Sequence, residues 1–398
     1  MSKPLHRWYT FPHSFTSDLV HALIDEWSLG PSDRVLDPFA GAGTTILACK
    51  EGGVPASGYD LSPLAVLASS VKVADYDLGR LQRLWSDIEE DLASSRVRVE
   101  RAYPDLVVRA LPGNLLVALD AAARTIAETE MSTEERGFFE LALLAVLPQF
   151  SKAVATGGWL RWIENQTDAV AVLPALRSRV SMMLDDLRDA QHPAASAWEV
   201  HLGDARALPD GQQTFSAVIT SPPYPNRHDY TRVFGVELMF RFLDWEKTRQ
   251  LRYQTFHSHP EARPMRPDAT GYAAPAGLTG LIARLKGLGV DPRVIRMLDG
   301  YFLDMYLCLK ELKRVCSAGA KVAIVVGNTR YSGETVLVDE LTADVGQQAG
   351  LTCERILAVR HRGNSAQQMG KYGRCPSRES IVVFGTPGLA DDASTCMR

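Results

Sequence analysis

The chain has 398 residues, of which 46% are hydrophobic and 23% are charged, with a formal net charge of −4. This is an ordinary globular composition with enough apolar residues for a large core, and its charge excludes a uniformly basic surface, so any nucleic-acid contact needs local basic patches. No apolar run reaches the roughly 20 residues of a membrane span, and the N-terminus lacks the apolar region of a secretory signal. The six cysteines are scattered without a CxxC or Cys/His cluster, which favours reduced thiols in a cytoplasm and argues against a metal site.

An aromatic stretch punctuated by proline, residues 8–15, precedes the first predicted helix. Residues 16–18 offer side-chain caps, apolar residues follow at helical spacing, and Gly30-Pro31 ends the pattern. Taken alone, this segment is an ordinary N-terminal helix held by an aromatic staple.

The next unit has the order strand, glycine loop, helix. Residues 34–37 predict a short buried strand, and residues 38–50 a tight turn that leads into a helix. Backbone N–H groups at such a helix N-terminus can be approached by a ligand, because the small residues leave the space open. A second strand, 56–60, ends in Asp60, which follows Asp37 by 23 positions. In nucleotide-binding βαβ units, an acid about 20 residues downstream of the glycine loop accepts hydrogen bonds from the ribose hydroxyls. The loop lacks the Gly-Lys-Ser/Thr ending of a triphosphate-binding loop, which disfavours a nucleoside triphosphate as ligand.

From about residue 78 to residue 192 the pattern is helical. A capping box at 132–135 opens an apolar helix that must be buried, and a Gly-Gly pair after Thr156 interrupts the pattern. We interpret this region as an inserted helical layer that serves as scaffold or lid. The alternative is contact with a ligand through Trp159, Arg161 and Trp162.

The rest of the chain alternates between strands and helices. Strands are predicted at 198–202, 215–220, 319–328, 351–360 and 380–384. Helices are predicted at 230–243, 292–315 and 334–349, and residues 244–289 are expected to be irregular. This order predicts an α/β fold, with 215–220 as a central strand buried on both faces. In such sheets ligands bind beyond the carboxyl ends of the strands, and four side chains occupy such ends: Asp37, Asp60, Asp204 and Ser221.

The tetrapeptide Ser221-Pro222-Pro223-Tyr224 follows the predicted central strand directly. Both prolines fix φ and lack an N–H, so their carbonyls are free acceptors. The Ser221 hydroxyl and a proline carbonyl could accept both hydrogens of a planar amino group, while Tyr224 stacks on its ring, a contact worth about 1–3 kcal/mol. The nitrogen could then attack an electrophilic methyl group held over the glycine loop, without a covalent enzyme intermediate. Pro-Pro-Tyr by itself is also typical of a plain loop or a polyproline ligand.

The two motifs resemble those of the S-adenosylmethionine-dependent DNA amino-methyltransferases, the N4-cytosine and N6-adenine enzymes. The stretch from Asp37 to Thr45 is similar to the family's cofactor motif, Thr220 to Tyr224 to its catalytic motif, and residues 11–15 to its extra cofactor-binding motif. The likeness covers residues 9–67, 202–240 and 321–384. It implies a Rossmann-like, seven-stranded, mostly parallel sheet, S-adenosyl-L-methionine as cofactor, and double-stranded DNA with a flipped target base as partner. A serine at the start of the tetrapeptide is similar to the cytosine-N4 branch.

The resemblance also implies roles for single residues. Contacts with the methionine, ribose and adenine parts of the cofactor are implied for Phe11, Asp37, Pro38, Phe39, Gly41, Gly43, Thr44, Asp60, Leu61, Asp204 and Ala205. Catalytic roles at the target base are implied for Ser221, Pro222, Pro223 and Tyr224. Contact with nucleic acid is predicted for Arg227, Arg232, Arg252, Arg362, Lys371 and Arg374. For the basic loop at 361–378, a solvated surface loop is an equal alternative.

The expected organisation has six parts. They are a cofactor-binding half at 1–77, a helical insertion at 78–195, a catalytic segment at 196–243, a target-recognition region at 244–291, a C-terminal part of the methyltransferase domain at 292–386 and a disordered tail at 387–398. Because the cofactor motif precedes the catalytic motif, unlike in many enzymes with this tetrapeptide, the helical insertion is the second candidate for target recognition.

The leading hypothesis is a site-specific DNA methyltransferase of a restriction-modification type, acting on cytosine N4. Alternatives are adenine N6, an RNA amino-methyltransferase that acts on an already unpaired base, and a cofactor-binding regulatory subunit without turnover. No appended RNA-binding module is recognisable, and the intact tetrapeptide argues against a subunit without turnover. A cognate restriction or defence nuclease is a further candidate partner, and no membrane contact is expected.

Overall fold

The computed structural model describes residues 3–12, 14–94, 101–156, 159–164, 168–190, 197–209, 214–264, 269–362 and 377–388. The predicted tail at 387–398 therefore lies mostly outside the described residues, as do Lys371, Arg374 and the side chain of Arg362. Within the described ranges, no helix combines the length and the apolar character that a bilayer span requires.

A seven-stranded sheet forms the centre of the molecule. Its strands lie in the order β10 (Thr352–Arg362), β11 (Ser377–Gly385), β7 (Cys316–Gly327), β6 (Phe215–Thr220), β1 (Val35–Asp37), β2 (Ala56–Asp60) and β5 (Trp198–Leu202). All neighbouring pairs from β7 to β5 are parallel, whereas β11 is antiparallel to both β7 and β10. The predicted seven-stranded, mostly parallel α/β sheet is confirmed.

The central strand β6 is buried on both faces because its side chains alternate between two hydrophobic cores. Ala217 and Ile219 belong to one core, and Val218 to the other. On β7, Ala323 and Val325 face the first core, while the residues between and beside them face the second. This period of two lets helices cover both faces of a parallel sheet.

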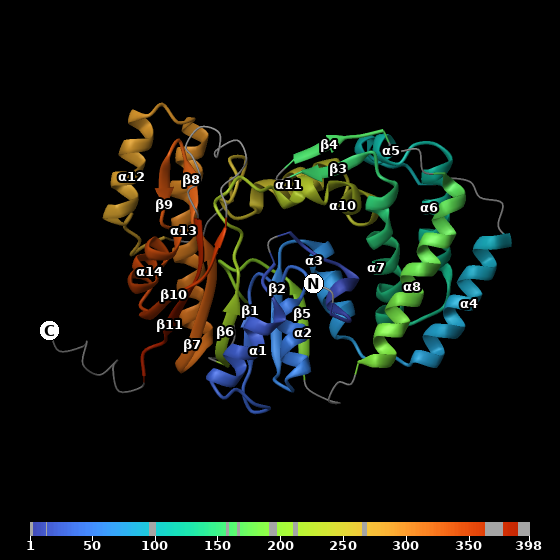
Figure 1. The fold of residues 1–398 in the computed structure, drawn as a ribbon, viewed down its shortest axis with the longest axis horizontal. Coiled ribbons are helices and arrows are strands. Elements are labelled where there is room, and N and C mark those ends of the chain that lie inside the picture. Colours follow the sequence, from blue (N-terminus) through green and yellow to red (C-terminus); the bar gives the residue numbers. More distant parts are fainter. Residues whose placement is uncertain are drawn as a thin grey trace.

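Helices lie in layers on both sides of the sheet (Figure 1). The helices α1 (Ser17–Glu26), α2 (Thr44–Glu51) and α3 (Pro63–Val73) pack in the first core. The helices α13 (Pro292–Val315) and α14 (Val338–Gln348) pack in the second, with α12 (Ala276–Gly287) outside α13. The central strands β7, β6 and β1 are thereby shielded from water on both faces.

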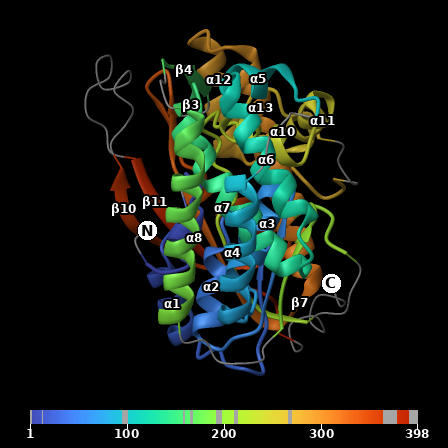
Figure 2. The same cartoon turned by 90° about the vertical axis from the view of Figure 1, so that its right-hand side faces the viewer.

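The predicted helical insertion forms a further layer outside α3. It contains α4 (Leu78–Ser94), α5 (Asp105–Ala110), α6 (Asn114–Glu128), α7 (Thr133–Phe150) and α8 (Val172–Asp189), with the short turns η1 (His6–Trp8) and η2 (Ala169–Ala171) packed against it. The long helices lie side by side in Figure 2. The capping box is present, since Ser132 accepts from the backbone of Glu135 and the Glu135 side chain accepts from the backbone of Ser132. As expected, the apolar α7 is buried, against α3 and its neighbours.

The helical pattern is interrupted around Thr156, as expected, because β3 (Ala153–Thr156) pairs with β4 (Trp159–Trp162) in an antiparallel arrangement that packs on α9 (Tyr230–Val233). Three other local predictions were wrong. The stretch 244–289 was expected to be irregular, but it contains α11 (Trp245–Gln254) and α12. The helix α11 is polar and has no strong apolar periodicity; its N-terminus is capped by Asp244, which accepts a hydrogen bond from the backbone N–H of Lys247. The helix expected at 230–243 is split into α9 and α10 (Gly235–Arg241). The helix expected at 334–349 begins later, because residues before it form a hairpin of β8 (Thr329–Tyr331) and β9 (Glu334–Val336).

Candidate active site

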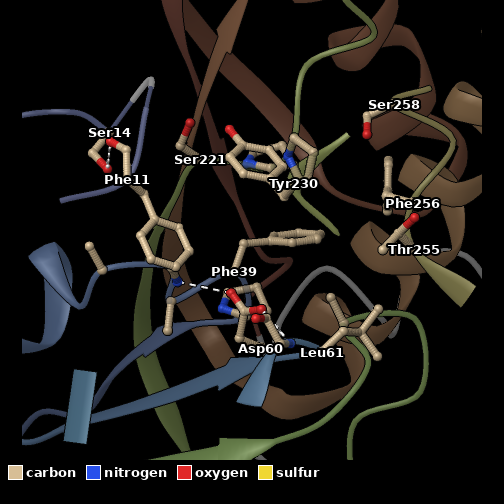
Figure 3. A pocket seen from close by; sticks show the side chains of 18 of the residues that line it. Phe11, Ser14, Phe39, Asp60, Leu61, Ser221, Tyr230, Thr255, Phe256 and Ser258 are labelled. Carbon is tan, nitrogen blue, oxygen red and sulfur yellow. Dashed lines mark hydrogen bonds between the residues drawn. The ribbon is translucent and has the colours of Figure 1, made fainter. Parts of the chain in front are cut away.

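One cavity lies beyond the carboxyl ends of β1, β2 and β6 (Figure 3). It is lined by all of the residues that the sequence predicts for catalysis and for cofactor binding, except Gly43. Of the predicted nucleic-acid contacts, the three whose side chains the structure describes, Arg227, Arg232 and Arg252, do not line it. Residues separated by more than 180 positions thus share one wall, because β1 and β6 are neighbours in the sheet.

The glycine loop and the tetrapeptide are joined by a direct hydrogen bond. The Thr220 hydroxyl donates to Asp37 Oδ1 at 2.5 Å, and the backbone N–H of Phe39 donates to the same oxygen at 3.1 Å. Thr45, in the first turn of α2, donates to the carbonyl of Ile219 at 3.1 Å. Burial raises the pKa of Asp37 to about 6, although the hydroxyl and backbone donors oppose the shift. Asp37 is therefore a carboxylate held ionised at neutral pH by a few fixed donors.

The glycine loop has no room for side chains at Gly43. Its φ is +79°, and a Cβ there would lie 2.9 Å from Ser69 Cα on α3. Gly43 thus shapes the loop from behind rather than lining the cavity. The neighbouring Gly41 donates its N–H to Asp60 Oδ2 at 2.9 Å, and Ser62 donates to Asp60 Oδ1 at 2.9 Å. Burial raises the pKa of Asp60, which is positioned by these backbone donors at the end of β2.

A buried lysine that the sequence reasoning missed connects the N-terminal segment to this loop. Lys72 on α3 donates to the carbonyls of Tyr9 at 2.6 Å and Ala42 at 2.7 Å, and to that of His6 at 3.3 Å. Burial lowers the pKa of Lys72 to about 7. The aromatic segment thereby lies against the cavity, with the Phe11 ring 4.4 Å from that of Phe234. No local pattern marks Lys72, because its three partners lie at least 30 residues away.

Asp204 lines the cavity, but its carboxylate is held by Arg206. The guanidinium donates through Nε at 2.9 Å and Nη2 at 2.7 Å, and Arg206 also lies 3.3 Å from Asp304 on α13. The Arg206 side chain is almost fully buried and donates to the carbonyl of Gln254 at 2.6 Å. Asp204 is thus fixed in place and can act as a hydrogen-bond acceptor for a ligand in the cavity. The spacing Asp204-x-Arg206 was the sequence signal that could have identified its partner.

The tetrapeptide is packed tightly against the sheet. The Ser221 hydroxyl lies within donating distance of the carbonyl of Val325 at 3.2 Å and of Tyr224 Oη at 3.3 Å. Tyr224 is buried and donates to Glu379 Oε1 on β11 at 2.9 Å. A Cβ at Gly327 would lie 2.8 Å from the Tyr224 ring, so only glycine at 327 leaves room for it. Sequence reasoning missed both Gly327 and Glu379.

The segment after α11 forms the opposite wall (Figure 3). Thr255, Phe256, Ser258 and His259 all line the cavity. The ring of Phe256 meets that of Phe39 edge-on at 5.5 Å. His259 Nε2 lies 2.8 Å from the Thr255 hydroxyl, and burial lowers the pKa of His259. This wall offers small hydroxyls and an aromatic face next to the tetrapeptide.

The predicted basic contacts lie in different surroundings. Arg227 is exposed at a φ of +68°, with its guanidinium 5.7 Å from the ring centre of Tyr331. Arg232 pairs with Asp229 and Glu261 and lies over the ring of Trp159 at 4.4 Å. Arg252 is buried and lies 3.0 Å from Asp229, so its charge is paired within the protein.

The residues of the cavity fit S-adenosyl-L-methionine. Two acids, the buried Asp37 and the half-buried Asp60, suit its cationic and hydroxyl groups, and Phe11 and Phe39 offer apolar faces for its ring. The glycine loop presents backbone to the ligand at the start of α2. Asp60 would hold the ribose, and Asp204 the adenine amino group.

Comparisons with known proteins agree with this fit. The chain matches the family N6_N4_Mtase, described as DNA methylase, over residues 2–69. It is 29% identical to the Type II methyltransferase M.BsoBI of Geobacillus stearothermophilus, over 97% of this chain and 86% of that protein. It is 27% identical to the Type II methyltransferase M.AvaI of a Nostoc species, over 97% of this chain and 87% of that protein.

Among solved structures, TrmN from Thermus thermophilus aligns with 96% of this chain and 52% of its own, at 12% identity and a TM-score of 0.29. That likeness is too low to bear on fold or substrate. The sheet, the shared cavity and the relatives agree with a methyltransferase that uses S-adenosyl-L-methionine: the chain is similar over nearly its whole length to Type II DNA methyltransferases, and its residues 2–69 match the DNA methylase family model.

Proposed function

We propose that the protein methylates the exocyclic N4 of a cytosine that is flipped out of double-stranded DNA. The observation that carries the proposal is the position of the Ser221 hydroxyl, at the end of the central strand and within donating distance of the Val325 carbonyl and Tyr224 Oη. Because its own hydrogen has a partner on the protein side, the oxygen lone pairs remain available to accept an N–H from the base.

The tetrapeptide positions the amino group. Ser221 and a carbonyl of Pro222 or Pro223 accept its two hydrogens, which directs the nitrogen lone pair towards the glycine loop. The bound cofactor supplies an electrophilic methyl group at that place. Tyr224 stacks on the base, and its ring is held in place by its contacts with Gly327 and Glu379. The opposite wall, with Thr255, Phe256 and Ser258, closes around the base and excludes water.

We further propose that residues 244–291 contribute to target recognition, since the segment after α11 lines the same cavity as the tetrapeptide. The parts at 1–77, 196–243 and 292–386 would form the methyltransferase core, with 78–195 as its supporting layer. The hairpin of β3 and β4 is the second candidate for DNA contact, because it lies on α9 and exposes Trp159 beside Arg232. Arg227 is exposed and remains a candidate phosphate contact.

A partner nuclease is also proposed, because the relatives M.BsoBI and M.AvaI are both Type II methyltransferases. Such a pair would work in the cytoplasm, where the reduced cysteines are stable. DNA methylated by the protein should then resist one restriction endonuclease at the methylated sequence.

The decisive experiment is transfer of tritium from methyl-labelled S-adenosyl-L-methionine to double-stranded DNA, followed by hydrolysis and chromatography of the bases. We expect the label in N4-methylcytosine. Label in N6-methyladenine would overturn the choice of base. Label in RNA but not in DNA would show that the substrate is RNA. Label in neither nucleic acid would favour a regulatory subunit without turnover.

A further inference from the structure

A chain of hydrogen bonds leads from the Ser221 hydroxyl to a buried carboxylate. Ser221 Oγ lies 3.3 Å from Tyr224 Oη, and Tyr224 Oη donates to Glu379 Oε1 at 2.9 Å. The Ser221 hydrogen can therefore be directed to the phenol oxygen, while the phenol hydrogen is directed to the carboxylate. In both hydrogen bonds the donor is the group nearer to the substrate position and the acceptor is the group farther from it.

The sheet fixes this chain through its register. Glu379 pairs with Gly327 across β11 and β7, and with Arg360 across β11 and β10. Because position 327 carries no side chain, the Tyr224 ring occupies the space above it and its hydroxyl reaches Glu379. Glu379 is buried, and the half-exposed Arg360 donates to its other oxygen. The carboxylate is thus oriented by Arg360 and shielded from water.

Methyl transfer to an amino group leaves a proton to be removed. As the N–C bond forms and the methyl–sulfur bond breaks, the positive charge moves from sulfur to nitrogen, and an N–H bond must break to give the neutral product. A serine hydroxyl, a proline carbonyl and a phenol cannot hold an additional proton at neutral pH. A carboxylate at the end of a hydrogen-bond chain can.

We propose that Glu379 is the final acceptor of this proton and acts through Tyr224 and Ser221. The amino group gives its proton to Ser221 Oγ, Ser221 gives its own to Tyr224 Oη, and Tyr224 gives its own to Glu379, which becomes neutral. The carboxylate is restored when the proton passes to water after product release. The inference rests on the proposed amino-methyl transfer, and it applies to either base.

Three other acids lie at the cavity. Asp60 is held by backbone donors and Asp204 by Arg206, which leaves Asp37 as the nearest competitor to the tetrapeptide. The Asp37 oxygen faces Thr220 and the backbone of Phe39, and no bond connects it to Ser221. The other groups around Glu379 leave the assignment intact. Among the residues that the structure describes, Arg360 donates to Glu379, Gly327 offers no side chain, and the adjacent Arg378 points to Asp339 and Glu340 instead.

The test compares Glu379→Gln with Tyr224→Phe and with Glu354→Gln, a matched change of an exposed β10 carboxylate that pairs with Lys321. Glutamine at 379 still accepts the hydrogen bond of Tyr224 but takes up no proton. Single-turnover rates are measured on DNA from pH 5.5 to 9, with cofactor affinity by calorimetry and DNA affinity by anisotropy.

We expect Glu379→Gln and Tyr224→Phe each to lower the single-turnover rate by about 100-fold, with both affinities within twofold of wild type. The double variant should lose no more than either single one, because both break one chain. The pH profile of Glu379→Gln should differ from that of the wild type, because glutamine takes up no proton. Glu354→Gln should behave as wild type.

A wild-type rate in Glu379→Gln would overturn the role of Glu379 even if N4-methylcytosine is the product. Should Glu379→Gln fail to fold, Tyr224→Phe decides, because it keeps the buried ring; a wild-type rate there breaks the proposed chain. Failure of the proposed function looks different, since the wild-type protein itself would then methylate no amino group of DNA.

Discussion

The hydroxyl of Thr220 donates to the carboxylate of Asp37 at 2.5 Å, and this bond joins the last residue of β6 to the last residue of β1. The residue that precedes the catalytic tetrapeptide is therefore bonded to the acid that opens the glycine loop. A change at one motif is expected to reach the other through this contact.

Replacing Thr220 by Val should weaken cofactor binding and make stability more sensitive to pH. Burial already raises the pKa of Asp37 to about 6, above its usual 3.8. Between these values the folded state keeps a proton that the unfolded chain has lost, so the contribution of Asp37 to stability falls as pH rises through this window. Loss of the Thr220 donor raises the folded pKa further and extends the window upwards.

Urea unfolding of Thr220→Val at pH 5 and pH 8 measures the effect. We expect a loss of about 1–3 kcal/mol at pH 8 and less at pH 5, because the lost donor matters most to the ionised acid. Equal losses at both pH values would contradict the coupling. Thr248→Val, which removes a buried hydroxyl bonded to the carbonyl of Asp244 away from the cavity, is the control for cofactor affinity.

Replacing Glu237 by Gln should stabilise the protein at alkaline pH. Glu237 on α10 is buried, and burial raises its pKa to about 7. Between about pH 4.5 and 7, Glu237 is ionised in the unfolded chain but still protonated in the folded protein, so the free energy of unfolding decreases as pH rises through this range. At pH 8 the variant should be more stable by up to about 3 kcal/mol, with little difference at pH 4.5. A gain that is the same at both pH values in urea unfolding would refute this account.

Replacing Gly327 by Ala should displace Tyr224 without changing the cofactor site. The new methyl group would lie 2.8 Å from the ring, while the backbone at 327 is not in the left-handed region. We expect a stability loss of about 1–3 kcal/mol and turnover reduced at least about tenfold, with unchanged cofactor affinity. Gly280→Ala on α12 is the control, since its nearest neighbour would be 3.6 Å away. Full turnover in Gly327→Ala would argue against a fixed Tyr224 in catalysis.

Replacing Asp60 by Ala should weaken cofactor binding by about tenfold or more, equivalent to about 1.4 kcal/mol. The loss has two sources, the proposed ribose contact and the bond that holds the N–H of Gly41. Calorimetry with S-adenosyl-L-methionine measures it, and Asp87→Ala, an exposed position on α4, is the control. Unchanged affinity in Asp60→Ala would remove the ribose role.

Much of the site could be predicted because it follows local rules. A short apolar strand, a glycine turn and a helix start occur together between Val35 and Thr44, and an acid ends the next strand at Asp60. The tetrapeptide follows an apolar strand, so its place at the edge of the sheet also follows from the sequence. By contrast, α11 was missed because a polar helix has little apolar periodicity, and the β3–β4 hairpin because its strands are only four residues long.

The sequence by itself determined the fold class, the order of most strands and helices, and the two motifs that meet in the cavity, since each depends on residues that are neighbours in the chain. Only the tertiary structure decided which side chains hold those motifs in place. Lys72, Arg206 and Glu379 act on partners up to 155 positions away, through strand register and helix packing. Such contacts have no local periodicity or spacing, so the path from Ser221 through Tyr224 to Glu379 became visible only once β6, β7 and β11 lay side by side.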